Sequence, residues 1–227
     1  MYGGNTIEVS PWEAADPALV RLIVLGSAWG ALLHQRGHLP LHAAVIARDD
    51  GAYALCGQPG AGKSSALSWF VARGYRLLSD DLTRLDIAPD GPPEVWPSVA
   101  QIKLTRAAIE HRGWNASGLG SEPLEKQVLP WHSAPARVEP LRAVVALRWG
   151  RFGLSKLSGL TAARALIEAA TYRRQLYGSP PELTRHWRNV LEIVRQAPVL
   201  ELTRPKLWSA SDSAMAELEA ALVETVA

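Results

Sequence analysis

The sequence predicts an α/β fold in which a mixed, partly antiparallel sheet carries a strand–loop–helix unit and the C-terminal third is helical. Three observations support this. The apolar run Gly51–Cys56 leads through a glycine-rich loop into a helical segment that begins at Ser64. Asp49-Asp50-Gly51 separates two apolar runs, which is a hairpin signal, so the strand before the loop is expected to pair antiparallel with its predecessor. From Thr161 onward the apolar spacing is helical.

The elements before the loop are well marked. Asp16-Pro17 predicts a helix start, with aspartate as the N-cap and proline at the first helical position. This helix is expected to run to about Gln35 and to end at Gly37. The β-rich segment Leu39–Arg48 follows as a strand.

The elements after the loop are expected in the following order: helix Ser64–Arg73; strands Tyr75–Leu78 and Thr83–Ile87; a turn over Ala88–Pro93; strand Glu94–Trp96; a short helix Arg106–His111; a mobile loop Gly113–Glu125; strand Leu141–Trp149, with Leu154–Leu157 as its partner across a turn; and helices Thr161–Arg174, Pro181–Gln196 and Ser211–Thr225. No internal repeat or linker is visible, so residues 1–227 are expected to form one domain.

Composition excludes several classes of protein. Lys plus Arg number 24 and Asp plus Glu number 22, with no basic run, so nucleic acid is not an expected partner. The single cysteine, Cys56, excludes an internal disulfide and fits a reducing cytoplasm. The start of the chain lacks the features of a secretion signal, and the apolar segment Leu22–Leu33 is too short to cross a bilayer. We therefore expect a cytoplasmic protein in which that segment is a buried helix. No structural metal is expected, because metal-ligand spacing is lacking among His34, His38, His111, His132 and His186.

The loop itself carries the strongest chemical signal. Gly57-Gln58-Pro59-Gly60-Ala61-Gly62-Lys63-Ser64 matches the pattern G-x-x-x-x-G-K-[ST] without a mismatch. The glycines let the backbone fold around a polyphosphate, Lys63 neutralises charge on the outer phosphates, and Ser64 can ligate Mg²⁺. The following helix points its positive end at the same phosphates. These eight residues and Ser65 are the expected nucleotide-binding residues, against the alternative of a plain glycine-rich turn.

Two aspartates and a histidine form the second signal. Asp80 and Asp81 end the strand after the loop's helix, where one carboxylate can hold Mg²⁺ and the other can face an incoming hydroxyl. The alternative is that Asp80 caps a turn and Asp81 is solvated. His42 lies on the strand before the phosphate-loop strand, and the hairpin would bring it close to the loop. It is expected either to orient Asp80 or meet a phosphate, or to be a hydrogen-bonded strand residue.

These residues are similar to a known family. Leu41-His42-Ala43-Ala44, the phosphate loop and the run from Arg73 to Asp81 together resemble the HPr kinase/phosphorylase superfamily over about residues 39–82. The resemblance implies a phosphate loop on a partly antiparallel sheet and ATP-dependent phosphorylation of a serine hydroxyl. It implies that Asp80 is the base, that Asp81 and Ser64 bind Mg²⁺, that Lys63 holds phosphate, and that His42 is an active-site histidine.

The family's glycine-rich signature after the aspartates is not matched here; Gly118-Leu119-Gly120 resembles it only weakly. Short single-domain relatives resemble kinases of lasso peptide pathways, which implies a ribosomally made precursor peptide as the acceptor. Lys126 is a candidate nucleotide contact, and Arg173 and Arg174 are candidates for contacting phosphate or an acidic peptide end.

Several alternatives stay open for the activity and the partner. The acceptor can instead be HPr or a small-molecule hydroxyl, or the chain can be a non-catalytic, nucleotide-responsive peptide-binding protein. The expected partner is a peptide or small protein with an acceptor serine, and a membrane is not an expected partner. Assembly into a homo-oligomer is an open expectation.

Overall fold

A computed structural model describes residues 4–87, 91–99, 101–117, 126–131 and 137–226. The main sheet contains the strands β1 (Leu39–Leu41), β2 (Ala43–Arg48), β3 (Gly51–Cys56), β4 (Arg76–Asp80), β5 (Thr83–Asp86), β6 (Glu94–Trp96), β9 (Glu139–Trp149), β10 (Gly153–Leu157) and β11 (Val199–Arg204). A separate two-stranded sheet pairs β7 (Gln101–Thr105) with β8 (Lys126–Pro130).

The sheet is mixed. Its strand order is β1-β5-β6-β9-β3-β2-β4, and β11 and then β10 extend it beside β9. At the centre, β9 runs parallel to both β3 and β11, whereas β2 is antiparallel to β3 and β4. The expectation of an α/β fold on a partly antiparallel sheet is confirmed.

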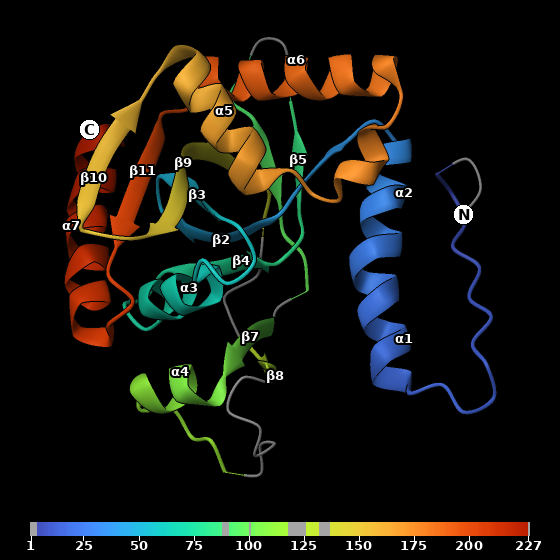
Figure 1. Cartoon of the computed structure of the whole chain (residues 1–227), viewed down its shortest axis with the longest axis horizontal. Coiled ribbons are helices and arrows are strands. Elements are labelled where there is room, and N and C mark those ends of the chain that lie inside the picture. The colour runs from blue at the N-terminus through green and yellow to red at the C-terminus, as the bar shows by residue number, and fades with distance from the viewer. Residues whose placement is uncertain (1–3, 88–90, 100, 118–125, 132–136, 227) are drawn as a thin grey trace.

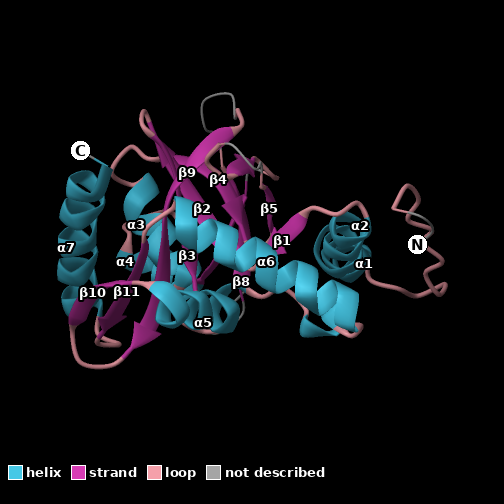
Figure 2. Cartoon of the chain, turned by 90° about the horizontal axis from the view of Figure 1, so that it is seen from above, coloured by secondary structure: helices cyan, strands magenta, loops and turns pink. Residues whose placement is uncertain are grey.

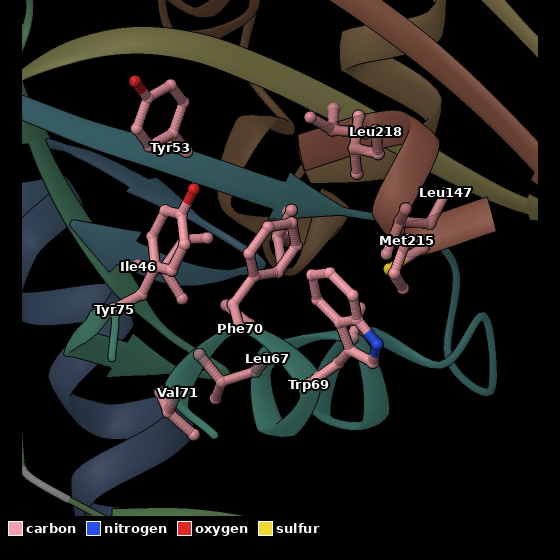
Figure 3. Packing of buried hydrophobic residues seen from close by; sticks show 14 of the residues in the cluster. Ile46, Tyr53, Leu67, Trp69, Phe70, Val71, Tyr75, Leu147, Met215 and Leu218 are labelled. Atoms are coloured by element: carbon pink, nitrogen blue, oxygen red, sulfur yellow. The ribbon is translucent and has the colours of Figure 1, made fainter. Parts of the chain in front are cut away.

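Helices cover both faces of this sheet (Figures 1 and 2). Helices α3 (Lys63–Val71) and α7 (Trp208–Val226), with α4 (Arg106–His111), pack on one face, and α5 (Gly159–Ala170) and α6 (Pro180–Gln196) pack on the other. Side chains alternate along β3 because its residues point to opposite faces. Tyr53 and Leu55 join the α3 core (Figure 3), and Ala54 and Cys56 join the α5–α6 core.

The hairpin between β2 and β3 has the expected two-residue turn. Arg48 pairs with Gly51, so Asp49 and Asp50 form the turn. Gly51 has φ +138°, and a Cβ atom there would lie 2.6 Å from the carbonyl oxygen of Pro140. Only glycine fits this approach to β9, so the hairpin and the packing of β3 beside β9 depend on the same residue.

The expected strand Leu39–Arg48 is divided at His42. Before this residue, β1 pairs with β5, and after it, β2 pairs with β3 and β4. The backbone N–H of His42 donates instead to the carbonyl oxygen of Ala170 at 2.9 Å. His42 therefore lies where the chain changes from one pairing partner to another.

One pairing prediction is wrong. The strand β10 was expected beside β9 but pairs with β11, and β11 lies between the two. No strand was expected at Val199–Arg204, because this short apolar segment stands between two helical patterns. Parallel pairing of β11 with β9 buries Val199 and Leu202 in the sheet, which a turn-based pairing of β9 with β10 would not achieve.

The N-terminal helical segment Pro17–Gln35 comprises α1 (Pro17–Ile23), η1 (Val24–Ala28) and α2 (Trp29–Gln35). As expected, the Asp16 side chain caps its first turn. Only its second half is buried, because α1 has no buried residue whereas Gly30–His34 are all buried. The expectation that the apolar stretch is too short to cross a bilayer considered Leu22–Leu33 alone. The continuous helical segment Pro17–Gln35 has the length and composition of a membrane-spanning helix, with a mean hydropathy of 1.4.

The connection between α5 and α6 lies next to the N-terminal segment. A short helix, η2 (Arg174–Tyr177), links α5 to α6. Immediately before η2, Tyr172 packs against the N-terminal segment, where a Cβ atom on Gly30 would lie 2.3 Å from the Tyr172 ring. This close contact holds α2 against the chain that follows α5, and Leu22 and Ile23 of α1 line a cavity together with Ala169 and Thr171 at the end of α5.

Candidate active site

The glycine-rich loop joins β3 to α3, so strand, loop and helix occur in the predicted order. Gly60 and Gly62 have φ +82° and +81°, a left-handed conformation that suits glycine. Gly62 is the N-cap of α3, and Lys63 and Ser64 form the first turn. Backbone N–H groups without helical partners and the positive end of the helix dipole therefore face the loop, which is the arrangement that binds phosphate.

Two side chains at the ends of neighbouring strands donate hydrogen bonds to carbonyl oxygens of the loop. At the end of β9, Trp149 donates its Nε1–H to the carbonyl oxygen of Gly60 at 2.7 Å. At the end of β11, Arg204 donates from Nη2 to the carbonyl oxygens of Ala61 at 2.9 Å and Gly62 at 3.2 Å. The Arg204 guanidinium also lies 4.2 Å from the centre of the Trp149 ring.

Arg204 is an unusual residue to find in this position. It has no exposed surface, and burial lowers its pKa to about 10. Within the described residues it has no carboxylate partner, and its Nη1 atom has no hydrogen-bond partner. A buried positive charge behind the loop makes this end of the sheet favourable for an anion.

Lys63 and His42 contact each other. The Lys63 Nζ atom lies 2.7 Å from His42 Nε2 and donates to the carbonyl oxygen of Gly57 at 2.7 Å. Burial lowers the pKa of the Lys63 ammonium group. If Lys63 donates to Nε2, the His42 proton is on Nδ1, which lies 3.2 Å from Asp81 Oδ1 and 3.2 Å from the Asp81 carbonyl oxygen. His42 thus links the loop lysine to the second aspartate.

Asp80 is buried and faces the loop serine. Its Oδ1 accepts a hydrogen bond from Ser64 Oγ at 3.0 Å, and its Oδ2 accepts from the backbone N–H of Lys103 at 2.7 Å. Burial raises the pKa of this carboxyl, and the two hydrogen bonds act in the opposite direction. The carboxylate is therefore fixed on the loop side, beside the hydroxyl of Ser64.

Asp81 is more exposed and differently placed. Its backbone has φ +103°, which is strained for a residue other than glycine. Its carboxylate lies 3.2 Å from Lys103 Nζ and 3.2 Å from His42 Nδ1. Burial alone would raise the pKa of Asp81, but the hydrogen bond with His42 and the charge of Lys103 outweigh it and hold this pKa well below its usual range.

A cavity of about 690 Å³ joins these groups. Of the predicted residues, those that line it are His42, Pro59, Gly60, Gly62, Lys63, Ser64, Ser65, Asp80, Asp81 and Lys126. Gly57 and Gln58 line a second cavity instead, on the other side of the loop, and Arg173 lines that cavity too. Gly118, Leu119 and Gly120 and the side chain of Arg174 lie outside the described residues.

The cavity also contains residues that sequence reasoning did not identify. Lys103 and Lys206 add positive charge to its wall, and Trp149 and Trp208 add aromatic surface. Lys103 comes from β7, a strand that was not expected, and Trp149 and Arg204 meet only because β9 and β11 are parallel neighbours. Within the described ranges, no three His, Cys, Asp or Glu side chains gather in a group that could hold a metal ion.

Comparison with known proteins gives distant similarities to solved structures. No family model matches the chain, and no curated protein matches it. A similar solved structure is that of the HPr(Ser) kinase/phosphatase from Coxiella burnetii, with 11% sequence identity and a TM-score of 0.39, covering 81% of this chain and 97% of that chain. The function is therefore inferred from the geometry of the site.

Proposed function

We propose that this protein is an ATP-dependent phosphotransferase that moves the γ-phosphoryl group to a serine hydroxyl of a peptide or small protein. One observation carries the proposal: Lys63 and most of the second half of the phosphate loop line the same cavity as Asp80 and Asp81. Phosphoryl transfer needs a cradle for the phosphates, positive charge, a metal ligand and an acceptor for the hydroxyl proton.

The cavity suits a nucleoside triphosphate. Its volume of about 690 Å³ is in the range of small-ligand sites. Lys63, Lys103, Lys126 and Lys206 all line it, so its charge favours a polyanion. Trp149 and Trp208 line the cavity and add aromatic surface against which a purine base can pack.

The residues fit a magnesium ion. Ser64 Oγ and Asp80 Oδ1 are oxygen donors 3.0 Å apart, and Mg²⁺ is commonly held by one or two protein oxygens together with substrate phosphates. When bound, the ion neutralises charge that develops on the phosphates. The family resemblance implies Asp81 as the metal ligand, but these contacts favour Asp80 for that role.

The same contacts favour Asp81, rather than Asp80, as the proton acceptor. Asp80 is held by Ser64 and Lys103, whereas the Asp81 side chain keeps 38% of its surface exposed and is oriented by His42. In the proposed step, the hydroxyl oxygen bonds to the γ-phosphorus, the bond to the β–γ bridging oxygen breaks, and the hydroxyl proton passes to Asp81. The products are the phosphoserine and ADP.

We further propose a precursor peptide of the lasso type as the acceptor, because short single-domain relatives with the motifs of residues 39–82 resemble kinases of such pathways. HPr and a small hydroxyl compound are the competing acceptors. A protein that only binds nucleotide and peptide would have no use for the strained, partly exposed carboxylate of Asp81.

The test is transfer of label from γ-labelled ATP, with Mg²⁺ present, to a candidate precursor peptide, read as one added phosphate by mass spectrometry. Asp81→Asn should keep ATP binding and lose transfer by about 10²-fold, the lower end of a general base's contribution, because the lowered pKa of Asp81 makes it a weak base. Asp80→Asn should instead raise the Mg²⁺ concentration needed for half-maximal transfer.

Asp49→Asn, on the exposed hairpin turn, is the control and should leave both measurements unchanged. Full transfer by Asp81→Asn would rule out Asp81 as the proton acceptor. Binding of ATP without phosphorylation of any acceptor would favour a nucleotide-responsive binding protein.

A further inference from the structure

Asp81 can be reached from two sides. A second cavity, of about 540 Å³, lies beside the nucleotide cavity. The two cavities share three lining residues: His42, Pro59 and Asp81. A group that enters the second cavity therefore meets the carboxylate of Asp81 without entering the space lined by Lys63 and Ser64.

We propose that this second cavity binds the acceptor, and that the acceptor is a peptide segment whose hydroxyl-bearing residue lies beside an anionic group. This inference rests on the proposed phosphotransfer and adds to it the location and chemistry of the acceptor site. Its elements are the oriented cation of Arg173, the apolar surface of α1, and the carboxylate of Asp81.

Two residues that line the cavity have strained backbones. Among the described residues, two that are not glycine have positive φ: Asp81 at +103° and Arg173 at +47°. Both line the second cavity. Such conformations are unfavourable and persist where the surrounding structure enforces them, often at ligand-binding sites.

Arg173 is held in place without a carboxylate. Its Nη2 donates to Ser27 Oγ at 2.8 Å, and its guanidinium carbon lies 5.8 Å from the centre of the Tyr172 ring. No ion pair joins it to an acidic side chain in the described part of the chain. Glu168 also lines the cavity but is paired with Arg148 and Arg164. Arg173 is thus the cation in this cavity that an incoming anion can pair with.

The opposite wall is apolar. Leu22 and Ile23 of α1 line the cavity and are 53% and 50% exposed. The same helical segment also exposes Leu19 and Trp29, so the apolar surface continues beyond the cavity. A wall of this extent fits an extended peptide with an apolar side chain near the hydroxyl better than it fits a small molecule.

The test uses one synthetic peptide with a blocked amino end and two leucines before a single serine, in four forms. In two forms the serine is followed by glutamate or by glutamine. In the other two the serine is last, with a free or an amidated carboxyl end. Free serine is the small-molecule probe. Three quantities are measured: ATP binding alone, peptide binding with a non-hydrolysable ATP analogue, and kcat/KM for transfer.

The protein should prefer each anionic form over its neutral counterpart by about tenfold, since a charge-assisted hydrogen bond is made only with the former. Arg173→Gln should reduce this preference to about twofold or less, and Arg173→Lys should restore part of it. Arg188→Gln, an exposed arginine on α6 outside the cavity, should keep the preference. Comparison of the glutamate and free-carboxylate forms identifies which source of the anion is used.

The apolar wall is tested separately. Leu22→Asn should raise the peptide KM about fivefold or more, because the transfer free energy of a leucine side chain is lost. Leu191→Asn is the matched control, since Leu191 is 47% exposed on α6 and does not line the cavity.

The outcomes separate this inference from the proposed function. Equal transfer to all four peptides, or transfer to free serine as efficient as to the peptides, would overturn the inference and leave the phosphotransferase intact. ATP binding without binding or phosphorylation of any of the four peptides would also overturn it. Failure to bind ATP would count against the proposed function itself.

Discussion

Two neighbouring aspartates acquire different properties from their surroundings. Asp80 is buried against Ser64, and burial raises its pKa. Asp81 faces two cavities, and His42 and Lys103 together hold its pKa below the usual range against the effect of burial. Environments that separate the pKa values of two carboxyls commonly assign them different tasks. Here the positive φ of Asp81 turns the two side chains toward different partners.

His186 provides a prediction about pH and stability. Burial lowers its pKa to about 4, whereas an exposed histidine titrates near pH 6.5. Between these values the unfolded chain binds more protons than the folded one, so the free energy of unfolding should rise with pH across this window. The contribution is about 2–3 kcal/mol, present above pH 6.5 and lost as the pH falls toward 4.

Urea unfolding at pH 4.5, 5.5 and 7 checks this prediction. In His186→Gln the rise in stability across the window should be smaller than in the unmodified protein. Asn189→Gln, on the same helix, introduces no titratable group and should show the original pH dependence. An identical slope in His186→Gln would contradict a buried neutral histidine.

The contact between β9, β11 and the loop gives a prediction at the scale of elements. Arg204→Met removes two hydrogen bonds to loop carbonyls but also removes a buried charge that lacks a carboxylate partner. Replacing a buried charge with an apolar side chain is often neutral for stability. We therefore expect little change in the melting temperature without nucleotide, and an affinity for ADP reduced about tenfold.

Thermal unfolding with and without ADP measures both effects, because ligand binding raises the melting temperature by mass action. Arg151→Met, an exposed arginine in the turn before β10, is the control. A large fall in the melting temperature without nucleotide, together with unchanged ADP affinity, would make Arg204 a structural residue only.

Prediction from sequence succeeded where the signal was local. The Asp49-Asp50-Gly51 turn fixed the antiparallel pairing of β2 with β3, and the capping aspartate Asp16 fixed the start of the N-terminal helix. The hairpin then explains why His42 reaches Lys63.

Prediction from sequence failed where strands that are far apart in the chain pair with each other. Leu154–Leu157 follows β9 closely in sequence, so a turn-based reading pairs the two, but the structure inserts β11 from more than forty residues later. Long-range pairing also explains why Arg204 and Lys103 were not predicted. Arg204 lies beside the phosphate loop because β11 pairs with β9, and Lys103 lies beside Asp81 because it belongs to β7. No motif marks either residue in the chain.

The hydrophobic core between α3 and the sheet gives a prediction about the stability of the whole molecule. Leu67 of α3 is fully buried in the cluster that also contains Phe70 and Met215 (Figure 3). Leu67→Ala should lower the free energy of unfolding by about 2–5 kcal/mol, from lost burial and the cavity left behind.

Urea unfolding gives this value directly. Leu160→Ala is the control, because Leu160 is 79% exposed and its truncation should cost less than about 0.5 kcal/mol. A loss of less than 1 kcal/mol in Leu67→Ala would indicate that α3 is not cooperatively packed on the sheet.

The sharing of Asp81 between two cavities has a consequence for kinetics. If each substrate enters through its own opening, neither blocks the path of the other, and no obligatory order of addition follows from the shape of the protein. Double-reciprocal plots should then intersect, ADP should compete with ATP alone, and the phosphorylated peptide should compete with the peptide alone. In such an enzyme the nucleotide and the peptide would bind in separate cavities and meet at the carboxylate of Asp81, which lines both.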